Sequence, residues 1–185
     1  MSQQLVSQAV SNVKVLLLLQ KIGEKVRELC ELYKEVQYSF RESFDRKAGN
    51  VFVRVGFVVW HVRDVLREVT TNFTCGRATV MFVIGGGCGD ICSDLSTSKY
   101  VDHVAVVIED VGAVRYGPSG SFDISSGTLF GLLNSDVTSD LESVLNELNR
   151  RCEKLRKLQR ISMFNKEAEH ILNDLVNLAN LLKVD

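Results

Sequence analysis

Apolar residues that alternate in steps of four and three across residues 22–40 constrain the fold of this chain more than any other feature. They are Ile22, Val26, Leu29, Tyr33, Val36 and Phe40. The other faces of this segment carry the charged residues Glu24, Lys25, Arg27, Glu28, Glu31, Lys34 and Glu35. Because a half-buried strand alternates every second residue and a helix repeats every 3.6, the spacing predicts a long amphipathic helix with one buried stripe.

Similar spacing recurs along the chain and predicts a mainly α protein. Further helices are expected near residues 5–17, 55–69, 99–111, 139–160 and 164–182. Gly23 marks a possible kink or join between the first two helical stretches. The last helix is expected to pack antiparallel on the one before it, across a short turn near Ser162.

The middle of the chain is ambiguous in secondary structure. Residues 79–84 form an apolar, β-branched run that ends in the glycine-rich segment 85–90, and such a run fits either a buried strand or a short helix. Minor β content around 79–84 therefore remains an alternative. The glycine-rich segment divides the expected fold into an N-terminal helical domain, 1–90, and a C-terminal helical domain, 91–185, with loop-like residues 112–136.

A concentration of positive charge on one predicted helix suggests an anionic partner. The formal net charge of the 185 residues is −1, so affinity for a polyanion requires an uneven distribution of charge. Residues 150–160 supply one, with Glu153 as the only acid among six cations. The cations are Arg150, Arg151, Lys154, Arg156, Lys157 and Arg160. They indicate either a phosphate-contact surface or the solvated face of an ordinary amphipathic helix.

A second, weaker set of candidate contacts consists of scattered arginines. They are Arg54, Arg63, Arg67 and Arg115. Arg115 precedes the segment 116–122, which carries two aromatic rings and resembles a surface loop. Exposed rings suit single-stranded nucleic acids because bases stack on them, although a packed turn is the better explanation of this segment.

Neither a membrane nor a metal is expected as a partner. The chain opens on polar residues 2–4, and its longest apolar run, 15–19, is far too short to span a bilayer. Five cysteines, an odd number, favour reduced thiols in a cytosolic compartment. A zinc site built from Cys75, Cys88, Cys92 and His103 would lack the short Cys-x-x-Cys spacing, so no cofactor is predicted.

Enzymatic activity is not expected, although a thiol hydrolase remains an alternative. Cys88 or Cys92 could serve as the nucleophile if His103 or His61 acted as the base. The segment 85–90 follows an apolar run as a phosphate-binding loop would. It lacks the Gly-Lys-Ser/Thr ending of such loops, so a hinge is the better interpretation.

Residues 75–160 resemble the small RNA-silencing suppressors of closteroviruses in the types of residue and their spacing. The resemblance is carried by segments 100–112, 116–122, 131–133 and 136–141. It implies two helical domains, a ring-like homo-oligomer in the cytoplasm of the infected host cell, and a basic surface that sequesters small RNAs largely irrespective of sequence. A helical scaffolding protein that assembles through the same apolar stripes without RNA is the alternative.

Overall fold

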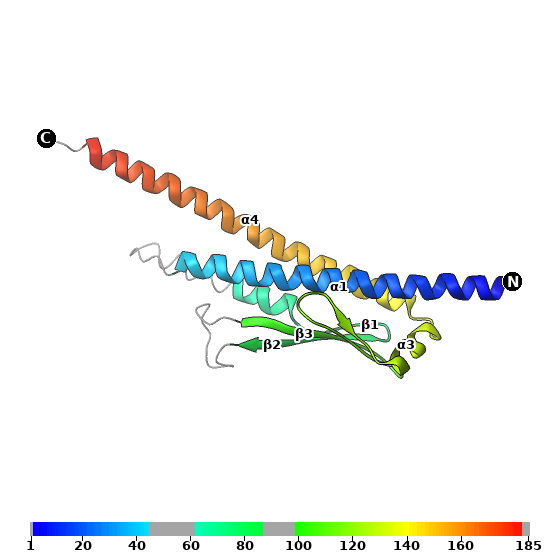
Figure 1. The fold of residues 1–185 in the computed structure, drawn as a ribbon. Helices are drawn as coiled ribbons and strands as arrows, with labels where there is room; N and C mark the ends of the chain where they lie inside the picture. Colours follow the sequence, from blue (N-terminus) through cyan, green and yellow to red (C-terminus); the bar gives the residue numbers. More distant parts are fainter. Residues whose placement is uncertain (1, 45–61, 87–98, 183–185) are drawn as a thin grey trace.

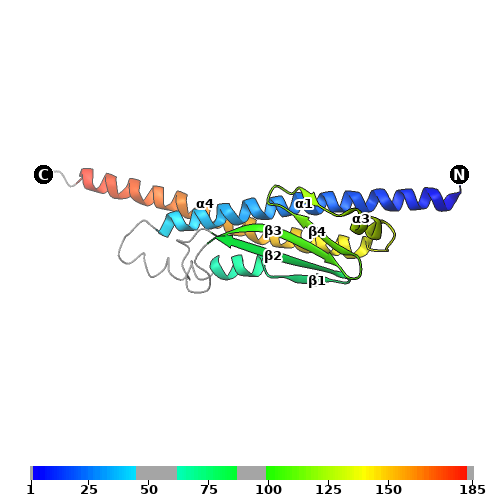
Figure 2. The same cartoon turned by 60° about the horizontal axis from the view of Figure 1, so that its bottom comes forward.

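Two long helices lie side by side on one face of an antiparallel sheet (Figures 1 and 2). The computed structural model describes residues 2–44, 62–86 and 99–182. The helices are α1 (Gln3–Phe44) and α4 (Thr138–Leu182). The described residues form long helices and a five-stranded antiparallel sheet, so the prediction of a mainly α protein with two helical domains is wrong, and the fold is mixed α/β.

The sheet is a meander in which each strand pairs with the next one along the chain. Its strands are β1 (Phe73–Cys75), β2 (Ala78–Gly86), β3 (Lys99–Ile108), β4 (Gly112–Tyr116) and β5 (Phe122–Asp123). Ala78, Val80 and Phe82 are buried, whereas Met81 and Val83 are exposed. This period of two places one face of β2 against the helices and the other toward solvent.

Strand β3 corrects the prediction of a helix over residues 99–111. Val104, Val106 and Ile108 are buried in strand alternation, but Val101 is buried as well. The pairing of β3 with β2 shifts register between Val83 and Ile84, which leaves Asp102 without a partner. This extra residue puts two buried valines three positions apart, and the bulge thereby imitates helical spacing.

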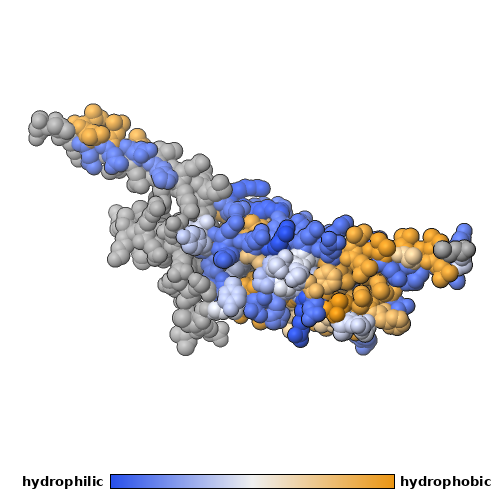
Figure 3. Space-filling view, in the orientation of Figure 1, coloured by the Kyte–Doolittle hydropathy of each residue, from blue (hydrophilic) through white to orange (hydrophobic). Residues whose placement is uncertain are grey.

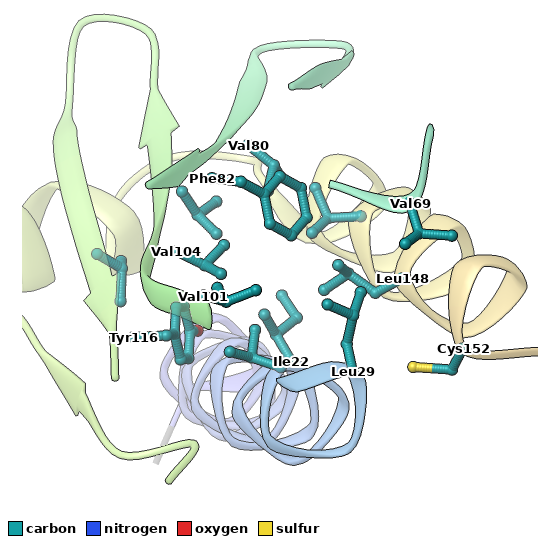
Figure 4. Packing of buried hydrophobic residues seen from close by; sticks show 14 of the residues in the cluster. Ile22, Leu29, Val69, Val80, Phe82, Val101, Val104, Tyr116, Leu148 and Cys152 are labelled. Atoms are coloured by element: carbon teal, nitrogen blue, oxygen red, sulfur yellow. The ribbon is translucent and has the colours of Figure 1, made fainter. Parts of the chain in front are cut away.

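The ambiguous run 79–84 lies within β2, as the β alternative allowed. Strands β2 and β3 pair with each other across the expected domain boundary at residue 90. One hydrophobic core also draws on both halves of the chain, with Ile22 and Leu29 of α1 facing Val80 and Val104 of the sheet and Leu148 of α4 (Figure 4). The halves therefore fold around a shared core.

Helix α4 continues through residue 162, so the predicted turn and antiparallel helix pair are wrong. Helices α1 and α4 run in the same direction, because residues later in α1 contact residues later in α4. The Lys14 ammonium lies 3.2 Å from the Glu142 carboxylate, and the Gln159 amide donates to Glu35 at 2.6 Å. The sheet and the short helix α3 (Ser126–Leu133) form the connection that makes this parallel arrangement possible.

Helix α1 is also continuous at Gly23, where a kink or join was considered. Gly23 allows the loop between β4 and β5 to approach the helix. A Cβ at Gly23 would lie 2.3 Å from the Gly120 carbonyl oxygen. Next to this contact, the buried Tyr116 hydroxyl donates to the Leu19 carbonyl at 2.9 Å. The two contacts fix the loop on α1.

We expect Gly120→Ala to lower the free energy of unfolding by about 1–3 kcal/mol. Gly120 has φ +83°, and an added Cβ would lie 2.4 Å from the Gly23 carbonyl oxygen. The matched control is Gly127→Ala in α3, where a Cβ meets nothing within 4 Å. Urea denaturation of both variants checks this prediction, and equal stabilities would contradict the close approach of the loop to α1.

Candidate nucleic-acid interface

Arg151, one of the six clustered cations of α4, is part of the protein interior. Its side chain is only 6% exposed, and Nε donates to Glu147 at 3.0 Å. The same guanidinium donates to the carbonyls of Val69 and Thr71, at the end of helical residues 62–69. It also lies 4.3 Å from the centroid of the Phe73 ring. Arg151 therefore fastens α4 to the start of the sheet and does not face solvent.

Three more of these cations form ion pairs within the protein. Arg150 donates to both carboxylate oxygens of Glu147, at 2.9 and 2.6 Å. Lys154 pairs with Glu68, and Arg156 pairs with Glu28 and Glu153. Hydrogen bonds from Arg150 and Arg151 hold the pKa of the Glu147 carboxyl at about 2. Much of the positive charge of residues 150–160 is thus balanced by acids of the same molecule.

The other predicted contacts are dispersed. Lys157 and Arg160 are exposed and make no ion pair within the described part of the chain. Arg67 is exposed on helical residues 62–69, where its neighbour Glu68 contacts α4. Arg63 is half-buried on the same helical segment. Arg54 lies outside the described residues.

Arg115 is separated from the α4 cations by the sheet. It is exposed on β4 between the buried Val114 and Tyr116. Because side chains alternate along a strand, Arg115 lies on the sheet face opposite α1 and α4. The nine predicted arginines and lysines that the structure describes therefore do not form one surface.

A pocket of about 580 Å³ opens between α1 and the first residues of β3. We call it the α1–β3 pocket. It is lined by Cys30, Lys34, Glu35, Gln37, Tyr38, Lys99, Tyr100, Val101 and Pro118. The lining brings two lysines from distant parts of the sequence to one opening. The sequence does not reveal this site, because the site joins residues about sixty positions apart and the spacing of residues 99–111 predicts a helix there.

A second hollow of about 600 Å³ lies farther toward the N-terminus of α1. It is lined by Leu16, Gln20, Gly23, Glu24, Arg27, Ser119, Gly120, Ser121 and Phe122. The loop between β4 and β5 borders both hollows, with Pro118 in the first and Ser119 in the second. Arg27 and Lys34 are seven residues apart and therefore share one face of α1.

Arg27, Lys34 and Lys99 differ from most of the α4 cations in one respect. None of the three forms an ion pair with another described residue. We call them the cation row. Glu24 and Glu35 are the acids that line the same hollows, and the Glu35 carboxylate accepts a hydrogen bond from Gln159 of α4. The row offers positive charge that no internal partner occupies, beside two concave surfaces.

The metal and thiol alternatives gain no support from the residues that can be described. Among residues 2–44, 62–86 and 99–182, no group of three or more histidines, cysteines or acids could hold a metal ion. Cys88, Cys92 and His61 lie outside these ranges. Burial raises the pKa of the Cys30 and Cys152 thiols to about 11, so both remain protonated near neutral pH.

The ends of both long helices expose apolar side chains. On α1 these are Leu5, Val6, Val10, Val13, Leu16 and Leu17, and on α4 they are Leu175, Leu178, Leu181 and Leu182. The hydrophobic surface gathers toward the N-terminal end of α1, away from the hydrophilic middle (Figure 3). The two ends project from the body on opposite sides (Figure 1).

The segment Gln3–Ser39 of α1 is long and apolar enough to cross a membrane, judged by length and composition alone. Its most apolar 18 residues are 22% buried within the protein. From Val15 onward, however, one face of α1 packs into the core. The apolar composition of that part is explained by its packing against the sheet and α4.

Comparisons with protein-family models, curated protein sequences and solved structures found no match to this chain.

Proposed function

We propose that this protein binds small RNAs largely irrespective of base sequence and suppresses host RNA silencing by sequestering them in the cytoplasm of an infected cell. The observation that carries the RNA-binding part is the cation row, Arg27, Lys34 and Lys99, which lacks acidic partners among the described residues and borders two hollows. Cations of this kind can meet phosphates without first breaking an ion pair. Binding through these cations depends on the charge of the phosphates and not on the identity of the bases.

Homo-oligomerisation is the second part of the proposal. Exposed aliphatic residues at opposite ends of α1 and α4 give each subunit two apolar surfaces that another copy can cover. A closed arrangement of copies would repeat the cation row around the assembly. Repetition allows a subunit with a formal net charge of −1 to bind a polyanion, because several modest patches act together.

The test compares two triple variants that each remove three positive charges. We expect Arg27→Ala, Lys34→Ala and Lys99→Ala together to weaken binding of unrelated short RNAs at least tenfold. The variant should also flatten the dependence of log K on log salt by about two units, since each phosphate contact contributes roughly 0.7–0.9. The control, Arg150→Ala, Lys154→Ala and Arg156→Ala, removes cations that are paired with acids. It should weaken binding less than about threefold.

Fluorescence anisotropy at several salt concentrations measures both quantities. Arg151 is excluded from the control because its side chain is buried and its replacement should destabilise the fold. Equal losses in the two variants would contradict a role for the cation row. A larger loss in the control would move the binding surface to α4.

A helical scaffold that assembles without RNA is the second candidate, and the exposed apolar helix ends favour it. Size-exclusion chromatography with light scattering, with and without RNA at low and high salt, separates the two functions. A discrete oligomer that carries RNA only at low salt supports RNA sequestration. An assembly that carries no RNA at either salt concentration supports the scaffold.

A further inference from the structure

The α1–β3 pocket combines an apolar interior with a charged rim. Cys30, Val101 and Pro118 contribute apolar surface, while Lys34 enters from α1 and Lys99 from β3. Tyr38, also part of the lining, is 63% exposed. At about 580 Å³, the pocket falls in the usual size range of small-molecule sites. Neither lysine forms an ion pair with a described residue, and the Glu35 carboxylate of the same lining accepts a hydrogen bond from the neutral Gln159 amide, so the lining carries two positive charges and one negative charge.

We infer that the α1–β3 pocket holds an unpaired nucleotide of single-stranded RNA, with the base against Tyr38 and the adjacent phosphates at Lys34 and Lys99. This inference rests on the proposed RNA-binding function and adds the strandedness of the ligand. A flat base and a phosphate match the two kinds of surface in the pocket: an exposed aromatic ring beside apolar atoms, and two cations. The chemistry is that of single-strand sites, in which rings stack on bases and basic residues follow the backbone.

The preference for an unpaired nucleotide follows from what each form of RNA exposes. In a duplex the base faces are stacked on one another, so only phosphates, sugars and groove edges can be contacted. A tyrosine in a pocket can stack on a base only when that base is splayed out of a helix. Tyr38 therefore has no function toward the interior of a blunt duplex, whereas the lysines can bind either form.

The other aromatic residue of the pocket, Tyr100, lies close to a glycine of the neighbouring strand. Gly85 lies opposite Tyr100 in the pairing of β2 with β3, and a Cβ at Gly85 would come within 2.7 Å of the Tyr100 ring. The Tyr100 ring thus lies across Gly85. Tyr38 is 63% exposed against 50% for Tyr100, so Tyr38 is the ring more open to a base.

The experiment compares Tyr38→Ala and Tyr38→Phe with the wild-type protein. Anisotropy titrations use a short labelled single strand, the same strand in a blunt duplex, and the strand with several abasic positions. We expect Tyr38→Ala to weaken single-strand binding roughly 5- to 100-fold, the range of one lost stacking contact. Tyr38→Phe should bind within about twofold of wild type, because the ring is kept.

The strand with abasic positions should bind the wild-type protein less tightly than the intact strand, whereas Tyr38→Ala should hardly distinguish the two. Phe130→Ala is the matched control, because Phe130 is 71% exposed on α3 and lies outside the pocket lining. Thermal melting followed by circular dichroism confirms that the variants are folded.

The outcomes separate this inference from the proposed function. Unchanged single-strand binding by Tyr38→Ala would overturn the stacking site while leaving RNA binding through the cation row intact. An equal loss for the strand and the blunt duplex would also overturn it, because removal of the Tyr38 ring should not weaken contacts to the paired bases inside a duplex. Failure of the wild-type protein to bind any of the three RNAs would overturn both the inference and the proposed function.

Discussion

Arg151→Met is expected to lower the free energy of unfolding by about 3 kcal/mol. The substitution keeps apolar bulk beside Phe73 but removes all donors from a side chain that is 6% exposed. The carbonyls of Val69 and Thr71 would lose these hydrogen bonds. Glu147 would keep only its contacts to Arg150. Unpaired acceptors away from water cost more than the mean value of a hydrogen bond, which accounts for the size of the effect.

Arg150→Ala is the control for Arg151→Met, because both arginines contact the Glu147 carboxylate. The Arg150 side chain is 51% exposed, and an exposed ion pair contributes at most about 1 kcal/mol. Urea denaturation at neutral pH should therefore rank Arg151→Met well below Arg150→Ala in stability. Similar losses in the two variants would mean that Arg151 is solvated and does not fasten α4 to the sheet.

Leu148→Ala should cost about 3–4 kcal/mol of unfolding free energy. Leu148 is fully buried in the core that joins α1, α4 and the sheet (Figure 4). Truncation removes its apolar contacts and leaves a cavity that two long helices and a sheet cannot readily close. Thermal and urea unfolding measure the loss.

Leu178→Ala provides the comparison on the same helix. Leu178 is 54% exposed on the projecting end of α4, so its truncation should change the stability of an isolated subunit by less than about 0.5 kcal/mol. The measurement is made at low protein concentration and repeated at high concentration. A loss comparable to that of Leu148→Ala at both concentrations would contradict the assignment of this end as outside the core.

The sequence predicts the long helices more reliably than it predicts how they are arranged. Residues 22–40 lie in α1, as the four-three rhythm indicates, since one stripe of a helix meets a single buried surface. The direction of packing between α1 and α4 was missed. It depends on contacts such as Lys14 with Glu142, which join residues far apart in the chain.

The sheet was missed because its clearest strand carries an irregularity. Val101 and Val104 are both buried on either side of the register shift, and three-residue spacing is also what a helix produces. The β-branched composition of residues 99–108 favoured a strand, but the periodicity outweighed it in the prediction. At a bulge, the β propensity of the residues favours a strand while the spacing of the buried residues favours a helix. The pairing with a neighbouring strand decides between them, and that pairing is a tertiary property.

For the candidate site, local sequence shows where charge is concentrated but not which charges remain available. The cations of residues 150–160 form a dense group in the sequence, yet their partners Glu28 and Glu68 come from other elements. Lys34 and Lys99 look unremarkable in the sequence because nothing local places them together. Only the packing of β3 beside α1 creates the α1–β3 pocket.

The most direct test of RNA binding at the cation row is lysine labelling of the wild-type protein, read by mass spectrometry, with and without saturating single-stranded RNA. Binding at the cation row predicts that RNA lowers the labelling of Lys34 and Lys99, whereas Lys154 and Lys157 on α4 react at unchanged rates. Protection of Lys154 and Lys157 without protection of Lys34 and Lys99 would contradict it and place the RNA on α4 instead.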